Sequence, residues 1–317
     1  MGIENTVSTD LKTLVVGCTP LARKVVNLLK KTTNLVGVVN LSPIAASNKS
    51  NYDSLSDVCD PFWTTDINDK ETEDWIAKQR PDVIIQCGWS QIFKSNILSI
   101  PKKYCIGIHP SPLPLGRGAA IINWKIIESK GRDVEWGNSL FVMTDKTDTG
   151  QILDFEPFII QARDNVRTAY QKVDQTSLTM LKRITPLLAL DKEHLVDQDN
   201  SKFTRYRKRK PKDGEMCFSW DSTTICDYVR ALTHPYPGAF FETKYGKVSV
   251  WQASETRSLY FYKTGTICKI MHNQGIYVKV GDHHGLCLER ISIDGIEYWA
   301  DEAAEILNLK VGDNLIG

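Results

Sequence analysis

The chain has 317 residues, 42% of them hydrophobic and 24% charged, which is typical of a soluble globular protein and excludes a disordered or fibrous class. Since one domain usually takes about 100–200 residues, this length predicts two domains, each large enough to bury a core. The formal net charge is +1, so the molecule as a whole lacks the strong field that draws nucleic acid or an anionic membrane to a protein.

The eight cysteines are spaced irregularly, and none belongs to a C-x-x-C pair. This pattern gives no support to a zinc site, and we expect no metal. Residues 1–10 lack the apolar run of a secretory leader, and no stretch approaches the roughly 20 apolar residues of a membrane span. The sequence therefore predicts a cytoplasmic protein without membrane association, whose cysteines are reduced and mostly buried.

Apolar segments of two periods alternate along the first part of the chain. Residues 13–17 and 35–40 are short and rich in β-branched side chains, which predicts buried parallel strands. Between them, residues 21–29 have apolar positions at helical spacing. A polar loop is expected over residues 43–60 and a helix over residues 69–79.

Three further strands are expected over residues 82–87, 104–109 and 138–143. Together with the helices between them, they predict a doubly wound, mostly parallel α/β sheet over residues 12–190. Gly17 ends the first strand, but no G-x-G-x-x-G pattern follows it. The sequence therefore gives no support to a dinucleotide cofactor.

The composition changes abruptly after this region. Seven of the eleven residues from Lys202 to Lys212 are lysine or arginine, and none is acidic. Such a charged segment, punctuated by proline and glycine, marks a domain boundary. We therefore expect a first domain over residues 1–200, a basic linker over 201–213 and a second domain over 214–317.

The second domain is expected to be a small OB-like β-barrel. Residues 223–232 predict a helix at its start. Short alternating segments separated by turn residues follow from residue 239 onward, and this rhythm is typical of a small barrel or sandwich. The expected strands cover residues 240–243, 247–252, 258–262, 267–271, 275–280 and 286–293.

Two residues stand out as candidates for chemistry. His109 lies where a predicted strand reaches its carboxyl end, the edge at which open α/β sheets bind ligands, and a rigid loop rich in proline and glycine follows it. Asp148 lies after the next predicted strand. A backbone hydrogen bond would explain the histidine alone and an Asx-turn the aspartate alone. Together, a carboxylate beside a histidine orients the imidazole and favours its charged form, as proton transfer near neutral pH requires.

The stretch IGIHPSPLPLGRGAAIINWKI, followed by SLFVMTDKTDTGQIL, resembles the signature of the folate-dependent formyltransferase superfamily. That signature runs Asn-x-His, Pro/Gly-Ser-x-Leu-Pro and Arg-Gly, with Asp-x-Gly some thirty-odd residues later. The stretch GEMCFSWDSTTICDYVRALTHPYPGAFF is similar to the start of the superfamily's carboxyl-terminal OB-like domain. The resemblance therefore covers nearly the whole chain.

The resemblance implies direct transfer of a formyl group from 10-formyl-tetrahydrofolate to an amine, with no metal and no covalent enzyme intermediate. His109 would donate to the developing oxyanion, which is worth roughly 3–4 kcal/mol per donor, and Asp148 would orient His109 and help remove the amine proton. Gly107 occupies the position of the superfamily's catalytic asparagine. Losing that donor predicts a rate lower by roughly 10²–10³ unless another group replaces it. Asn123 is one candidate, although we favour for it the packing of a helix residue near Trp124.

The resemblance also assigns binding residues. Trp89 and Ile92 would line the pterin pocket, although core packing also explains Trp89, and residues 142–148 would close it. The expected folate contacts are Trp89, Ile92, Ser111, Leu113, Arg117, Met143 and Asp145. The expected acceptor contacts are Arg117, Gly118, Asn123 and Trp124.

The acceptor is the least constrained part of the prediction. The basic linker could bind phosphates of tRNA or of a nucleotide sugar, or it could be a solvated connector. Lys49 is the only cation of residues 41–60, where a tRNA-specific relative carries a basic loop. We therefore favour an amino sugar on a nucleotide carrier. A methionyl-tRNA formyltransferase, a 10-formyl-tetrahydrofolate hydrolase, an inactive folate-binding protein and assembly into a homodimer stay open.

Overall fold

The computed structural model describes residues 8–47, 49–244 and 246–316. Residues 1–7, part of the stretch in which no leader is expected, lie outside them. The chain divides into two compact units, of which the first contains residues 1–121, 135–159 and 171–207, and the second residues 122–134, 160–170 and 208–317. The division at residues 207 and 208 falls inside the expected basic linker, whereas residues 122–134 and 160–170 group with the second unit.

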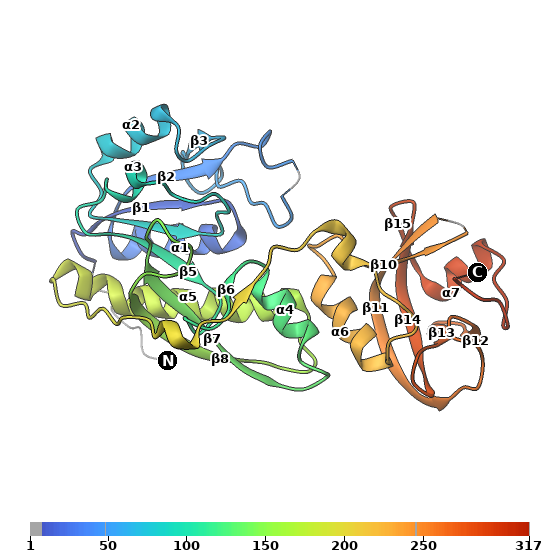
Figure 1. Ribbon diagram of the computed structural model, residues 1–317. Helices are drawn as coiled ribbons and strands as arrows, with labels where there is room; N and C mark the ends of the chain where they lie inside the picture. The colour runs from blue at the N-terminus through green and yellow to red at the C-terminus, as the bar shows by residue number, and fades with distance from the viewer. Residues whose placement is uncertain (1–7, 48, 245, 317) are drawn as a thin grey trace, which may run out of the picture. The chain divides into compact units, whose positions relative to one another are not determined.

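The first unit is built on a seven-stranded sheet in the order β3-β2-β1-β4-β5-β7-β8 (Figure 1). Its strands are β1 (Lys12–Gly17), β2 (Asn34–Leu41), β3 (Phe62–Thr64), β4 (Val83–Cys87), β5 (Tyr104–His109), β7 (Val134–Val142) and β8 (Ile152–Ile160). The strands from β3 to β5 pair in parallel, whereas β7 pairs antiparallel with β5. The prediction of a mostly parallel α/β sheet is confirmed, although β3 and β8 were not predicted.

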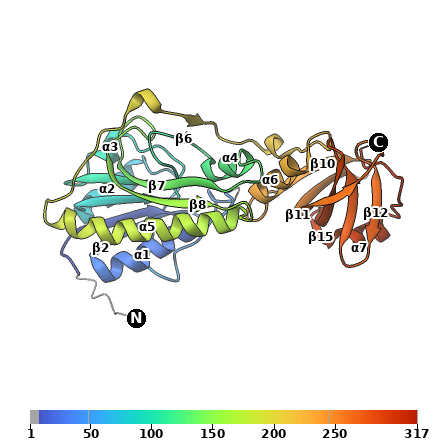
Figure 2. The same cartoon turned by 90° about the horizontal axis from the view of Figure 1, so that it is seen from below.

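Helices cover both faces of this sheet (Figures 1 and 2). The helices are α1 (Pro20–Thr32), α2 (Lys70–Gln79), α3 (Ser95–Leu98) and α5 (Val166–Ala189). Val15 packs on one face with α1 and α5, whereas Leu14 and Val16 pack on the other with α2 and α3. Because β1 is buried on both faces, it reads in the sequence as a continuous apolar run. The predicted helices over residues 21–29 and 69–79 are confirmed.

Short elements complete this part of the chain. They are β6 (Arg117–Gly118), α4 (Ile121–Ile127), β9 (Arg205–Tyr206) and the 3₁₀ turns Asn200–Lys202 and Pro211–Gly214. Strand β9 pairs in parallel with β6, so the start of the expected linker is hydrogen-bonded to the first unit. None of the helices in the described part of the chain combines the length and apolar character needed to cross a bilayer.

The second unit contains an antiparallel sheet in the order β10-β11-β14-β13-β12, with β15 paired to β14. Its elements are α6 (Ser222–Leu232), β10 (Ala239–Thr243), β11 (Gly246–Leu259), β12 (Ile267–Met271), β13 (Gly275–Lys279), β14 (His284–Ile293), β15 (Ile296–Trp299) and α7 (Ala300–Ile306). The separate strand expected over residues 258–262 is wrong. Strand β11 continues to Leu259, and its pairing with β14 shifts register at several points along the way.

A buried aspartate explains why residues 122–134 group with the second unit. Asp227 on α6 is 2% exposed. Its carboxylate accepts hydrogen bonds from Ser129 Oγ at 3.1 Å and from the Gly131 amide at 3.0 Å, and it pairs with Arg230 Nε at 2.9 Å. All three partners lose this acceptor if the carboxylate is removed.

We expect Asp227→Ala to lower the free energy of unfolding by about 3 kcal/mol, because it removes three hydrogen bonds to a buried carboxylate, one of them from the charged Arg230 guanidinium. Urea unfolding followed by circular dichroism measures this change. Asp221→Ala is the matched control on the same helix: it removes the exposed N-cap bonds to the Thr224 amide and hydroxyl and should cost about 1 kcal/mol. Equal losses in the two variants would contradict the role given to Asp227.

Candidate functional site

His109 is the last residue of β5, and its side chain is buried at the carboxyl edge of the sheet. Its Nε2 atom lies 2.8 Å from the Gly116 carbonyl oxygen. Because a carbonyl only accepts, Nε2 must carry the proton in this arrangement. The other ring nitrogen, Nδ1, lies 3.7 Å from Asp148 Oδ1. This distance is too long for a direct hydrogen bond, but it places the carboxylate beside the ring.

Asp148 belongs to the turn that follows β7. Its backbone is left-handed, with φ of 58°, a conformation that non-glycine residues seldom adopt. Its Oδ2 atom accepts a hydrogen bond of 2.8 Å from the Gly118 amide, and its carbonyl accepts one of 3.0 Å from Gln198 Nε2. The structure therefore brings the two predicted catalytic side chains together and fixes both by bonds to neighbouring backbone groups.

The loop after His109 is held by hydrogen bonds to side chains of β7. Trp136 Nε1 donates to the Pro110 carbonyl at 2.8 Å, and Ser139 Oγ donates to the Ser111 carbonyl at 2.7 Å. The Leu113 amide donates to the same Ser139 hydroxyl at 3.2 Å. Ser111 and Leu113, both expected to contact folate, are buried, and Ser111 Oγ has no hydrogen-bond partner among the described residues.

Arg117 is buried, and its guanidinium is engaged within the first unit. Its Nε and Nη2 donate to Gln198 Oε1 at 3.1 and 2.6 Å, and Nη2 also donates to Asn200 Oδ1 at 2.6 Å. Burial lowers the pKa of Arg117 below its usual value, while the Asp148 carboxylate raises it in part. Arg117 was expected to bind ligand, but the described bonds of its guanidinium reach Gln198 and Asn200.

Gly118, expected to contact the acceptor, holds Asp148 through its backbone amide. Its φ is 106°, and a Cβ atom at this position would lie 2.1 Å from the Tyr206 carbonyl oxygen. Only glycine fits here, since any side chain would push β6 away from β9. The glycine of the Arg-Gly pair is therefore required by the close approach of two chain segments.

Gly107 faces Phe141 across the antiparallel pair of β5 and β7. A Cβ atom on Gly107 would lie 2.5 Å from Phe141 Cε1 and 3.2 Å from Met143 Cγ. The Phe141 ring thus fills the space that an asparagine side chain would need. The ring also meets His109 edge-on, with centroids 6.4 Å apart. Residue 107 therefore contributes no side-chain donor, and the apolar Phe141 ring occupies the space beside it.

The residues expected around the pterin differ in how deeply they are buried. Trp89 is 7% exposed and belongs to the apolar cluster against which Met143 packs. Its Nε1 atom is buried without a hydrogen-bond partner among the described residues, so a donor is left over there. Ile92 is 61% exposed, and Asp145 is also exposed.

Asn123 and Trp124 lie on α4 and group with the second unit. Asn123 is fully buried, and its Nδ2 donates to the Ala231 carbonyl oxygen at 2.8 Å. The Arg209 guanidinium lies over the Trp124 ring, 4.6 Å from its centroid. One N–H of the Asn123 amide is therefore engaged within the second unit.

Sequence reasoning did not find Gln198, Asn200 or Phe141. Gln198 and Asn200 follow α5 in an irregular segment, and no motif distinguishes them. Phe141 belongs to a predicted strand, but only the register of β5 against β7 places it opposite Gly107. Among the described residues, no cluster of three or more His, Cys, Asp or Glu side chains could hold a metal ion.

Comparison with known proteins shows the family to which the chain belongs. The Formyl transferase family matches residues 20–185, and the Formyl transferase, C-terminal domain family matches residues 208–299. The chain therefore belongs to the formyl transferase family. The bifunctional polymyxin resistance protein ArnA of Wigglesworthia glossinidia brevipalpis is 32% identical over 207 residues, which cover 65% of this chain and 31% of that relative.

Two solved structures have a similar fold. HypX from Aquifex aeolicus, in complex with tetrahydrofolic acid, has a TM-score of 0.67 at 14% identity and matches 96% of this chain and 49% of its own. The N-formyltransferase of Helicobacter canadensis, in complex with folinic acid and dTDP-3-aminofucose, has a TM-score of 0.63 at 15% identity and matches 88% of this chain and 98% of its own. The chain thus spans about a third of the curated relative and about half of HypX.

We expect Gly107→Asn to lower the free energy of unfolding by about 1–3 kcal/mol, because the new side chain overpacks the site against Phe141. Phe141→Ala should also destabilise the protein, by leaving a cavity. The double variant should lose less stability than the sum of the two single losses, because the asparagine side chain can occupy the space that the Phe141 ring vacates. Urea unfolding of the four proteins measures this coupling, and strictly additive losses would contradict it.

Proposed function

We propose that this chain transfers the formyl group of 10-formyl-tetrahydrofolate to the primary amine of an amino sugar on a nucleotide carrier. The observation that carries the proposal is the buried His109 beside Asp148 at the carboxyl edge of the sheet. Membership of the formyl transferase family supports the reaction, and the folate and amino-sugar ligands of the similar structures support the two substrates.

In the proposed reaction, the amine nitrogen attacks the formyl carbon and gives a tetrahedral intermediate. Asp148 helps remove the amine proton, and protonated His109 stabilises the oxyanion. The intermediate then collapses: its bond to the folate N10 breaks, N10 takes the proton that Asp148 removed from the amine, and a formamide and tetrahydrofolate leave. The buried position of His109 strengthens this stabilisation, because electrostatic interactions are larger away from water.

Trp89 supports the proposed folate position. Its buried indole N–H lacks a partner among the described residues, and an acceptor on the pterin ring would satisfy it. The surrounding cluster, against which Met143 packs, supplies the apolar wall that a flat heterocycle needs. Trp89 and Met143 would therefore hold the folate, with its formyl group directed toward His109.

Hydrolysis of 10-formyl-tetrahydrofolate is a second candidate, and Gly107 favours it. The family's asparagine is replaced here by a glycine whose side-chain space is filled by Phe141. Such a site offers one polar contact fewer to the intermediate. The two candidates differ in one property: transfer needs an amine, whereas hydrolysis needs only water.

Release of tetrahydrofolate from 10-formyl-tetrahydrofolate, followed spectrophotometrically, separates the candidates. The assay is run without acceptor, with nucleotide-linked amino sugars and with methionyl-tRNA. We expect turnover that depends on an amino sugar. Equal turnover in the absence of any amine would establish hydrolysis, and folate binding without turnover in every arm would refute the proposal.

We expect His109→Ala to lower kcat by at least about 10²-fold, because it removes the group that stabilises the oxyanion. Folate binding should stay within a few-fold, since Trp89 and its neighbours are untouched. His272→Ala is the matched control: its Nδ1 also lies 3.7 Å from an aspartate, Asp301, but its side chain is 82% exposed. Full activity in the His109 variant would remove His109 from the mechanism.

A further inference from the structure

We propose that Gln198 is a positioning residue of this reaction, which holds Asp148 in the conformation that directs its carboxylate toward His109. The inference rests on the proposed function. Gln198 does not touch His109 through any described bond. It acts through the backbone of the turn that carries Asp148.

Every polar atom of the Gln198 side chain is engaged. Its Nε2 donates to the carbonyl oxygens of Asp148 at 3.0 Å and of Gly150 at 2.7 Å. Its Oε1 accepts both bonds from Arg117. Gln198 is only 8% exposed, so water cannot readily replace these contacts.

These contacts close a ring around the site. Gln198 holds the Asp148 carbonyl, Asp148 accepts the Gly118 amide through its carboxylate, and Gly118 is bonded covalently to Arg117, which returns to Gln198. Each member therefore restrains the next. Loss of the Gln198 amide opens the ring at the residue whose carboxylate faces His109.

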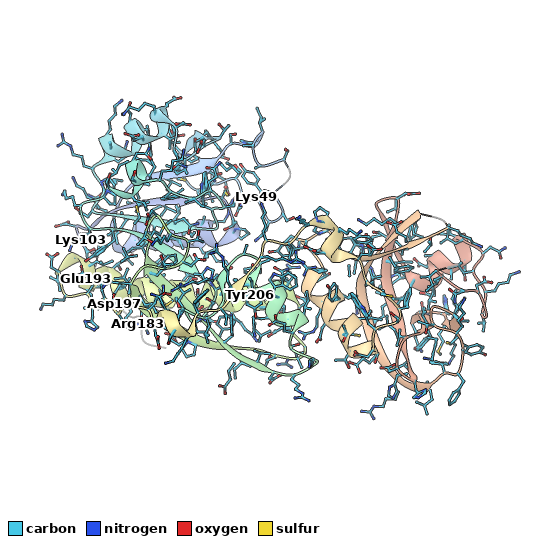
Figure 3. The ribbon with its side chains drawn as sticks, in the orientation of Figure 1. Lys49, Lys103, Arg183, Glu193, Asp197 and Tyr206 are labelled. Atoms are coloured by element: carbon cyan, nitrogen blue, oxygen red, sulfur yellow. The ribbon has the colours of Figure 1, made fainter. Side chains whose placement is uncertain are left out.

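Gln198 belongs to residues 196–206, which we call the strap. Asp197 and Tyr206, labelled in Figure 3, lie near its two ends. At one end the Val196 amide and carbonyl bond to Ile152, and at the other β9 pairs with β6. Since both ends are tied to the first unit, the strap presents Gln198 to the Asp148 turn as a fixed group.

The left-handed backbone of Asp148 explains why such a restraint is needed. A non-glycine residue in this region is strained, and it stays there only when its surroundings hold it. The bonds from Gln198 to the carbonyls of Asp148 and Gly150 supply that restraint on the backbone. Without these bonds, the backbone of Asp148 can relax to a negative φ, which moves its carboxylate away from the His109 imidazole.

Two substitutions separate the possible contributions of Gln198. Gln198→Met keeps the shape but removes every hydrogen bond, whereas Gln198→Glu keeps an acceptor for Arg117 and loses both donors to the turn. We expect either variant to lower kcat by about 10²-fold with the KM for 10-formyl-tetrahydrofolate within a few-fold, because displacement of a catalytic group by about 1 Å has an effect of this size. Full activity of Gln198→Glu would overturn the proposal.

Gln151→Met is the matched control. Gln151 also lies in this region, and its Nε2 bonds only to the exposed Asp197 side chain in the described contacts, at 2.9 Å. Its kcat should equal that of the wild type. In an Asp148→Asn background, Gln198→Met should change kcat by less than about threefold, since a residue that acts through Asp148 has nothing left to position. Multiplication of the two single effects would overturn the proposal.

Amide hydrogen exchange supplies a readout that does not depend on turnover. If Gln198 holds Asp148, the Gly118 amide should exchange at least about tenfold faster in Gln198→Met, while amides in the centre of β1 keep their protection. Unchanged exchange at Gly118 would refute the positioning role even if the wild type shows no turnover. A wild type without turnover but with faster Gly118 exchange in the variant would refute the proposed function alone.

Discussion

The site depends on one hydrogen bond of 2.8 Å, from the backbone amide of Gly118 to the carboxylate of Asp148. This bond joins the loop that follows His109 to the turn that follows β7. It requires close approach on both sides, because a Cβ atom on Gly118 would meet the Tyr206 carbonyl and one on Gly150 would lie 1.7 Å from the Val142 carbonyl oxygen. The Arg-Gly and Asp-Thr-Gly motifs therefore carry glycine for steric reasons, and the carboxylate of Asp148 is oriented by the Gly118 amide.

The sequence predicted the sheet because buried parallel strands read as apolar runs. It also placed His109 and Asp148 after strand ends, but β7 runs antiparallel to β5, so the two side chains meet only because the residues between Val142 and Asp148 return toward His109. The hydrogen bonds of Gln198 and Asn200 to Arg117 could not be predicted in this way. They join residues more than 80 positions apart in the chain, and depend on where residues 196–206 return after α5. Phe141 was missed for a related reason, since its position opposite Gly107 depends on the antiparallel register of β7.

Gly107 and Phe141 distinguish this site from the family pattern. Where that pattern has an asparagine donor, this chain has an aromatic ring packed edge-on to the histidine. The exchange removes one hydrogen-bond donor and adds apolar surface beside a reacting group. In the proposed reaction it would leave His109 and Asp148 with a larger share of the charge stabilisation, so their relative position would matter more. The hydrogen bonds that hold Asp148 in place are consistent with a need for this fixed position.

Transfer of an isotopically labelled formyl group tests the central claim most directly. The chain is incubated with 10-formyl-tetrahydrofolate labelled at the formyl carbon and with a nucleotide-linked amino sugar, and the products are analysed by mass spectrometry. The account predicts that the label appears in an amide of the sugar, in amounts equal to the tetrahydrofolate released. Label found in formate, with the amino sugar unchanged, would contradict it.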